Sequence, residues 1–477
     1  MTTNAITGNS SFFASKKKVI GLIIGLVVGV LFFALPPAEG MSVEGMRCTG
    51  ILLGGLAWII LDVFPNYAVM LSIFSLWAVF KVVPFTAAFA SFSGSTFWLM
   101  TGAVGMGVAG LKSGLLERLA LTVMKIFPAT YKGQLTALVV SGIIIAPLIP
   151  STTAKAAIIA PVALSISDSM GYKRKSRESV GLFSGFFLGY VTTWSTFLSA
   201  SFVGYTVLGL FPEEIAKEFT WIQWFIAALP WSIVVLVITY IVILKTYAPK
   251  DDVKIETKQI DEKIASLGPL KLSEKITMLV LIVSLLFWMT ERLHGISSAL
   301  VAMVAMCVLI AVNVTNSKDF NSEMGWSNLI FIGCIVGIGG VLSATGVNAY
   351  LADVFAGFIT PLMENIWLLV PVLAILTYLL RFLIVSTTTT ITILAVVLFP
   401  FAQAAGIHPF VVGFILYVSV HIWLTEYQLP NFLTCQAATK GAMLDHKQFI
   451  PQGIWYVVLS LIGLFVSIPW WKFLGMC

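Results

Sequence analysis

Two clusters of hydroxyl side chains interrupt apolar stretches of this chain. One reads Ser151-Thr152-Thr153 and the other Ser386-Thr387-Thr388, so that 235 residues, about half of the 477-residue chain, separate their first members. Ser and Thr donate and accept hydrogen bonds without carrying a charge, and they can therefore bind an anion or replace water around a cation. Polar clusters at membrane depth are costly and usually functional. The duplication predicts one binding site built by two repeats.

Each cluster is expected to lie at the tip of a helical hairpin, where a helix begins. A helix N-terminus presents free N–H groups and a partial positive charge, which suit a carboxylate. Two tips that face each other would suit a molecule with two carboxylates. The alternative is that these side chains only hydrogen-bond back to carbonyls of their own helix. The duplication favours the functional interpretation.

A polar break follows each cluster 44 residues later, inside an apolar span. Broken helices free backbone groups for a ligand, so both breaks contribute weaker candidates for the site. These candidates are Thr193, Ser195 and Thr196 in the first break and Pro430 and Asn431 in the second.

Ionisable residues also fall inside apolar stretches near the clusters. Lys155 follows the first cluster by two residues, and an ammonium group at that depth must be paired, hydrated or neutral. His421 precedes the second break, where it either serves the site or pairs with Glu426. We expect Arg381 to extend towards the membrane surface and leave it out of the site.

Composition defines the class of protein. The chain is 58% hydrophobic and 10% charged, which predicts an all-α polytopic membrane protein without a sizeable soluble domain. The net charge of +6 is a topology signal, and no nucleic-acid partner is expected. Five scattered cysteines show neither disulfide nor zinc spacing, and we expect no metal and no cofactor.

Apolar stretches predict eleven spans and two re-entrant hairpins. Irregular backbone at the hairpin tips is tolerated only where it lines a cavity enclosed by protein. The hairpins cover 133–170 and 366–405. The spans lie near 19–35, 47–64, 66–84, 95–111, 180–211, 220–247, 275–292, 296–314, 328–345, 409–436 and 450–471.

Lys and Arg gather in the segments that face the cytoplasm if the N-terminus is cytoplasmic and the C-terminus extracellular. Residues 1–46 then form an N-terminal cytoplasmic segment and the first transmembrane helix. The ranges 47–247 and 275–477 form two repeats, joined by a solvated cytoplasmic linker, 248–274. An odd number of spans separates equivalent elements, so the second repeat is expected to be inverted, an architecture typical of secondary transporters.

Other functional classes fit less well. Gly105, Gly107 and Gly110 formally match a dinucleotide fingerprint, but within a spanning helix they favour close helix packing. No arrangement of residues predicts an enzyme. A channel would need a continuous polar path, whereas two hairpins that meet at the midplane predict an occluding site.

Along nearly its whole length, from about residue 20, the chain resembles the divalent anion/sodium symporter family, whose members carry di- and tricarboxylates. The marker of the family is a Ser-Asn-Thr signature at two hairpin tips, which here reads Ser151-Thr152-Thr153 and Ser386-Thr387-Thr388. The resemblance implies a homodimer, an elevator mechanism, substrate binding by the signature residues, and sodium sites beside them.

Both signature asparagines are replaced by threonine, and Lys155 and His421 place positive charge where the family implies sodium. Such cations would replace sodium in neutralising a dianion, and a carrier that stays charged when empty would return poorly without a counter-substrate. We therefore expect sodium-independent exchange of malate, succinate or 2-oxoglutarate across a bacterial plasma membrane, as in the bacterial exchangers and plastid 2-oxoglutarate/malate translocators that the chain most resembles. A sodium- or proton-coupled di- or tricarboxylate symporter is the alternative, and a carrier of another oxyanion is a third.

Overall fold

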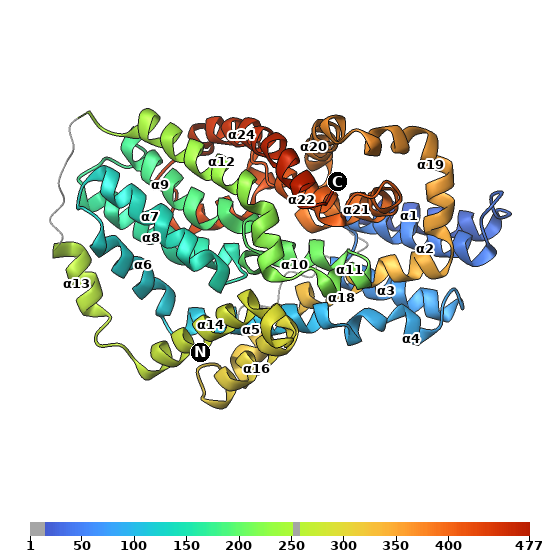
Figure 1. The fold of residues 1–477 in the computed structure, drawn as a ribbon, viewed down its shortest axis with the longest axis horizontal. Coiled ribbons are helices and arrows are strands. Elements are labelled where there is room, and N and C mark those ends of the chain that lie inside the picture. The colour runs from blue at the N-terminus through green and yellow to red at the C-terminus, as the bar shows by residue number, and fades with distance from the viewer. Residues whose placement is uncertain (1–14, 251–257) are drawn as a thin grey trace. The chain divides into compact units, whose positions relative to one another are not determined.

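The computed structural model describes residues 15–250 and 258–477, and all regular structure within these two ranges is helical (Figure 1). Apolar residues supply the helix interiors, and Ser or Thr side chains cap many of the helix starts, as Ser42 and Thr130 do by accepting a hydrogen bond from a backbone N–H. The chain is thus an all-α polytopic membrane protein, which confirms the predicted fold class.

Nine helices in the described ranges are long and apolar enough to cross a membrane, or ten if a bent pair counts as one span. Six of the nine match predicted spans, and three are arms of the hairpins. The other five predicted spans are two helices of 14 residues, two broken helices, and the bent pair, whose members meet at 65°. These five predicted spans are not among the nine long helices because their helices are short, broken or bent, and not because their composition is polar.

One compact unit comprises residues up to 97 together with 325–359. Its helices are α1 (Lys16–Ala34), α2 (Val43–Ile60), α3 (Asn66–Val79), α4 (Phe85–Ala88), η2 (Ala90–Ser93), α18 (Trp326–Ala344) and most of α19 (Val347–Glu364). Small residues allow α1 and α2 to pack closely, because a Cβ atom on Gly54 would lie 2.6 Å from the carbonyl oxygen of Gly25.

The second unit comprises residues 98–324 and 360–477 and contains both hairpins. Outside the hairpins and breaks, its longer helices are α5 (Ser95–Lys112), α6 (Leu115–Ile126), α12 (Trp221–Tyr247), α14 (Leu272–Met289), α16 (Ser298–Ala311) and α24 (His446–Phe473). Short helices α11 (Glu213–Glu218), α13 (Lys258–Ser266), α15 (Glu291–His294) and α17 (Ser317–Glu323) connect them. Helices α12 and α24 pack side by side (Figure 1).

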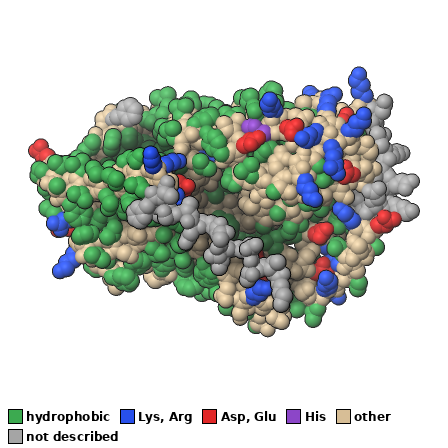
Figure 2. Space-filling model, turned by 180° about the vertical axis from the view of Figure 1, so that it is seen from behind, with side chains coloured by type: hydrophobic (Ala, Val, Ile, Leu, Met, Phe, Trp, Pro, Cys, Tyr) green, Lys and Arg blue, Asp and Glu red, His purple; other side chains and the backbone are tan. Residues whose placement is uncertain are grey.

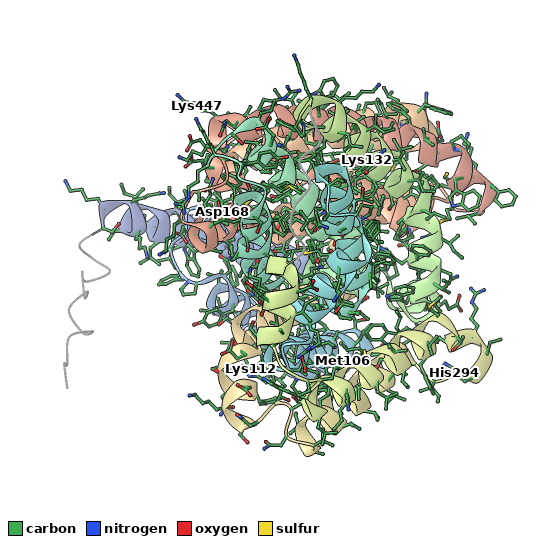
Figure 3. The ribbon with its side chains drawn as sticks, turned by 90° about the vertical axis from the view of Figure 1, so that its left-hand side faces the viewer. Met106, Lys112, Lys132, Asp168, His294 and Lys447 are labelled. Atoms are coloured by element: carbon green, nitrogen blue, oxygen red, sulfur yellow. The ribbon has the colours of Figure 1, made fainter. Side chains whose placement is uncertain are left out.

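Two helix pairs occupy the ranges predicted for the hairpins. Helices α7 (Tyr131–Ile145) and α8 (Thr152–Ser169) cover the first range, and α20 (Ile366–Leu383) and α21 (Thr387–Ala404) cover the second. Figure 3 labels Lys132, near the start of α7, and Asp168, near the end of α8, and both side chains are exposed.

The glycines of α5 serve packing, as predicted, rather than nucleotide binding. A Cβ atom on Gly105 would lie 2.4 Å from Cγ of Met306 on α16. Cβ atoms on Gly107 and Gly110 would lie 3.0 Å from Pro150 and 3.1 Å from Ile149, the residues that lead into the first hairpin tip. Two of the three glycines therefore make room for that tip.

Large apolar side chains are exposed on several helices, and Figure 2 shows such side chains over much of one face. Val30 on α1 is 63% exposed and Leu279 on α14 is also 63% exposed. Such a surface is unfavourable in water but favourable in the hydrocarbon of a bilayer.

Ion pairs hold several of the helix ends together. Lys112, at the end of α5, lies 3.0 Å from Asp319 on α17, and its hydrogen bond lowers the pKa of the Asp319 carboxyl group. Within the predicted linker 248–274, α13 packs on α6, and the side chain of Arg118 on α6 is buried. Arg118 donates to the carbonyl oxygens of Leu267 and Gly268, both at 3.1 Å. Residues 251–257 of the linker lie outside the described ranges.

Arg118 also pairs with Glu274 of α14, with 2.7 Å between Nε and Oε1. We expect Arg118→Gln to destabilise the purified protein by about 2 kcal/mol, because Glu274 would lose its charged donor. Lys125→Gln, which breaks the exposed Lys125–Asp261 pair on the same helix, should cost about 0–1 kcal/mol. Thermal unfolding in detergent measures the stability of both variants. A melting temperature of Arg118→Gln equal to that of Lys125→Gln would contradict a stabilising role for Arg118.

Candidate functional site

The first hydroxyl cluster begins a helix, as predicted. Helix α7 ends at Ile145, a 3-10 turn covers Ala146–Leu148, and the backbone of Ile149 and Ser151 is extended. Pro150 favours this extended approach because it disfavours helical geometry in the residue before it. Ser151 then caps α8, since its hydroxyl accepts from the backbone N–H of Ala154 at 3.2 Å.

The second cluster repeats this arrangement. Ser386 caps α21 by accepting from the backbone N–H of Thr389 at 3.2 Å, and the hydroxyl of Thr389 donates to Ser386 at 2.8 Å. Thr388 lies 3.2 Å from the same Ser386 oxygen. Thr390 instead donates back to the carbonyl of Ser386, the alternative role considered for such residues. Both tips therefore present a helix N-terminus with hydroxyls around it.

Exposure differs among the six predicted tip residues. Thr153 is exposed, Thr152 is buried, and Ser151, Ser386, Thr387 and Thr388 are intermediate. Both tips therefore combine hydroxyls that a ligand could reach with hydroxyls that support the backbone.

The first break lies between α9 (Arg177–Tyr190) and α10 (Phe202–Gly209), with 3-10 turns at Thr192–Ser195 and Leu198–Ala200. Thr193 donates to the carbonyl of Gly189 and Thr196 to the hydroxyl of Ser232, so both are already engaged. The hydroxyl of Ser195 is buried and has no hydrogen-bond partner among the described residues. Of the three predicted residues, Ser195 is thus the one whose hydroxyl could still form a hydrogen bond.

The second break lies between α22 (Pro409–Ser419) and α23 (Pro430–Thr439), with a 3-10 turn at Glu426–Gln428. Asn431 connects this break to the first hairpin tip. Its side-chain oxygen accepts from the hydroxyl of Thr153 at 2.8 Å, and its Nδ2 lies 3.2 Å from the hydroxyl of Thr152. Pro430 begins α23 with an exposed side chain. The structure thus brings Asn431 to the tip residues, although 278 residues separate it from Thr153.

Lys155 is completely buried, one turn into α8. Its ammonium group donates to the carbonyl oxygen of Ala200, in the first break, at 3.1 Å. None of the ion pairs within residues 15–250 and 258–477 includes Lys155. The side chain therefore links the first hairpin to the first break without an acidic partner.

His421 is also buried, with 1% of its surface exposed, but it has different surroundings. Its ring packs against Trp194, with 3.9 Å between the ring centroids, and lies near Trp423 and Tyr456. Neither ring nitrogen has a hydrogen-bond partner in the described part of the chain, and Glu426 is exposed. Pairing between His421 and Glu426, one of the two alternatives, is therefore not what the structure shows.

Arg381 does not extend to the membrane surface, and that expectation was wrong. Its side chain is completely buried and donates to four backbone carbonyl oxygens. Nε binds Val420 at 2.9 Å, Nη1 binds Ile384 at 2.6 Å and also Val385, and Nη2 binds Gln428. Because Arg381 lies in an apolar stretch, the sequence did not indicate that its side chain binds backbone carbonyls. Its position five residues before Ser386 was the one feature that could have suggested a place beside the second tip.

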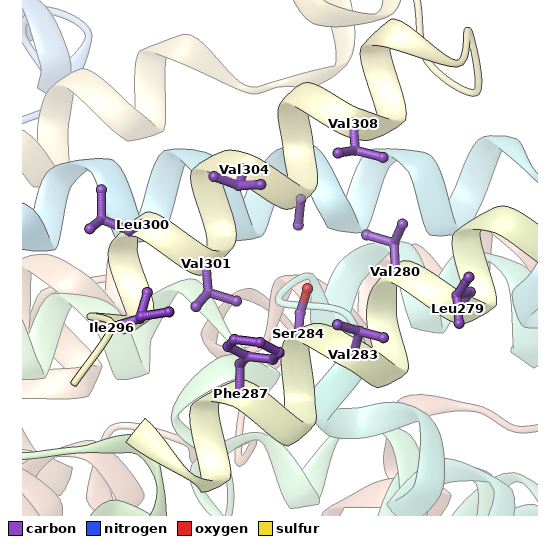
Figure 4. A pocket seen from close by; sticks show the side chains of 11 residues that line it. Leu279, Val280, Val283, Ser284, Phe287, Ile296, Leu300, Val301, Val304 and Val308 are labelled. Atoms are coloured by element: carbon purple, nitrogen blue, oxygen red, sulfur yellow. The ribbon is translucent and has the colours of Figure 1, made fainter. Parts of the chain in front are cut away.

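A separate groove of about 390 Å³ lies between α14 and α16 (Figure 4). Leu279, Val283, Phe287 and Val304 are among its lining residues, and Ser284 is the one polar side chain there. A carboxylate would find almost no hydrogen-bond donors in this groove, so it does not compete with the hairpin tips as an anion site.

Together, two capped hairpin tips and two broken helices within one unit of a polytopic helical protein define a class. This arrangement is that of secondary transporters, in which discontinuous helices form the substrate site.

The chain belongs to the family described as the sodium:sulfate symporter transmembrane region, whose model matches residues 16–477. This membership confirms the resemblance to divalent anion/sodium symporters. Among curated relatives, the chloroplast dicarboxylate transporter 2.1 of Arabidopsis thaliana is 27% identical over 96% of this chain and 83% of its own. The inner membrane protein YbhI of Escherichia coli is 27% identical over 72% of this chain and 74% of its own. The putative malate transporter YflS of Bacillus subtilis is 26% identical over 71% of this chain and 72% of its own.

Solved structures show a similar fold. The YdaH transporter of Alcanivorax borkumensis aligns with a TM-score of 0.57 at 15% identity, covering 97% of this chain and 98% of its own. MtrF of Neisseria gonorrhoeae aligns with a TM-score of 0.55 at 15% identity, covering 94% and 93%. The chain is therefore a multi-pass membrane protein of an anion transporter family.

If the tips bind substrate, Ser151→Ala and Ser386→Ala should each raise the apparent KM for a dicarboxylate. The matched control is Ser176→Ala, which removes the cap of α9 away from both tips. Each of the three substitutions should cost about 1 kcal/mol of stability through the lost cap, so only the KM separates them. Transport kinetics in proteoliposomes measure the effect, and an unchanged KM in both tip variants would remove the hairpin-tip site.

Proposed function

We propose that this protein exchanges dicarboxylates such as malate, succinate and 2-oxoglutarate across a bacterial plasma membrane, independently of sodium. The observation that carries the proposal is the completely buried ammonium group of Lys155, one turn from Ser151 at the first tip. The names of the chloroplast dicarboxylate transporter and the putative malate transporter support the substrate class.

The lysine argues against sodium at the first tip. A sodium ion about 4 Å from an ammonium group would be repelled by about 4 kcal/mol at an effective dielectric constant of about 20. A built-in cation instead neutralises part of the charge of a dianion. His421 was predicted from the sequence as a second such cation, and that role stays a prediction.

A cation that belongs to the carrier has a kinetic consequence. The empty carrier keeps a buried, uncompensated charge, and carrying it across the membrane is costly. The loaded carrier is neutralised by its substrate. Return therefore requires a counter-substrate, which is the behaviour of an obligate exchanger.

The proposal extends to movement and assembly. Both hairpins and both breaks belong to one compact unit, which supports an elevator mechanism in which this unit carries the substrate. We also propose a homodimer with a cytoplasmic N-terminus and an extracellular C-terminus, on the basis of the family and of the charge distribution along the sequence.

Labelled succinate uptake into proteoliposomes tests the transport mode. We expect uptake only when the vesicles contain unlabelled dicarboxylate, with the same rate whether or not sodium is present. Uptake into empty vesicles that sodium drives would contradict the exchanger. It would establish the alternative, a coupled symporter, which the name of the family favours. Stronger competition by sulfate than by malate would instead indicate another oxyanion.

Lys155→Met should abolish or strongly reduce exchange, because the substitution removes the buried charge but keeps an unbranched side chain of similar length. Lys173→Met, in the exposed loop before α9, is the matched control and should exchange like the unmodified protein. Exchange assays on both variants, reconstituted at equal protein density, make the comparison. Full activity of folded Lys155→Met would show that the charge is not needed.

A further inference from the structure

Each half of the chain contains one buried cation that joins its hairpin to the following break. In the first half, Lys155 of α8 donates to Ala200 of the first break. In the second half, Arg381 of α20 donates to Val420 and Gln428, at the two ends of the second break. Both side chains are completely buried, and neither belongs to an ion pair within the part of the chain described.

The guanidinium group of Arg381 binds the backbone that leads into the second tip. Its Nη1 atom binds the carbonyls of Ile384 and Val385, the two residues that precede the cap Ser386. Ile384 and Val420 are the C-caps of α20 and α22, so the cation also lies at two helix C-termini. Carbonyl groups at helix ends attract positive charge.

His421 makes none of these contacts. Its ring nitrogens have no hydrogen-bond partner among the described residues, and its ring packs on Trp194. An arginine stays protonated in proteins, whereas a histidine in apolar surroundings tends to be neutral. Arg381 therefore meets the requirements for a permanent charge that His421 does not.

We propose that Arg381, rather than His421, is the fixed cation of the second repeat and positions the second tip for one of the two carboxylates of the substrate. Lys155 has the corresponding role at the first tip. This inference rests on the proposed function, because it assigns one built-in positive charge to each carboxylate of a dicarboxylate.

Competition between succinate and its half-amide, succinamate, tests this assignment. The two molecules have nearly the same shape, but succinamate replaces one carboxylate by a neutral amide. Inhibition constants are measured against exchange of labelled succinate in proteoliposomes. For the unmodified protein, succinamate should bind about tenfold to a hundredfold more weakly, the range expected when one charged interaction is lost.

In Arg381→Gln the ratio of the two inhibition constants should fall towards one, because the amide then occupies the tip that has lost its cation. Arg381→Lys keeps the charge and should keep most of the ratio. His421→Gln should also keep the ratio. Arg292→Gln, which removes an exposed arginine, should leave both exchange and the ratio unchanged.

A purely structural role for Arg381 would lower the amount of folded protein and weaken both inhibitors equally. An unchanged ratio in Arg381→Gln, or a ratio that collapses in His421→Gln instead, would overturn the assignment. If Arg381→Gln does not fold, the unmodified protein still tests the inference. A ratio of its two inhibition constants near one would exclude a cation for each carboxylate. A protein that does not exchange succinate at all would refute the proposed function, a result distinct from exchange with an unchanged ratio.

Discussion

The need to satisfy backbone polar groups away from water constrains the rest of this structure. A helix that is broken at membrane depth leaves N–H and C=O groups without their usual partners, and hydrocarbon offers none. The chain contains two hairpin tips and two breaks of this kind. Hydroxyl caps at Ser151 and Ser386 satisfy N–H groups at the tips, while other side chains must satisfy the carbonyls.

The carbonyls of the breaks are bound by donors of several kinds, which come from distant parts of the sequence. The indole N–H of Trp224 binds Ser195, the hydroxyl of Tyr417 binds Trp194, and Lys155 binds Ala200. Neutral donors would suffice for hydrogen bonding alone. The use of an ammonium and a guanidinium group adds charge where the peptide dipoles already favour it, and under the proposed function both would attract the anionic substrate.

The sequence was sufficient to predict the features that depend on local pattern. Hydropathy located the helices, and hydroxyl residues after an apolar run located both tips, because an N-cap needs only its own neighbouring N–H groups. It was not sufficient for contacts between distant segments. The bridge from Asn431 to Thr153 and the burial of Arg381 depend on how helices far apart in the chain pack together. Three polar residues of the breaks looked equivalent in sequence, yet Thr193 and Thr196 proved to be engaged while Ser195 is free.

The two buried cations lie on opposite sides of their tips, and this asymmetry bears on the ancestry of the protein. With the 235-residue offset between the repeats, Lys155 corresponds to Thr390 and Arg381 to Ala146. Neither charge has a counterpart in the other half, so a gene duplication alone does not account for them. If the halves descend from one ancestral segment, each half acquired its cation separately, after the duplication.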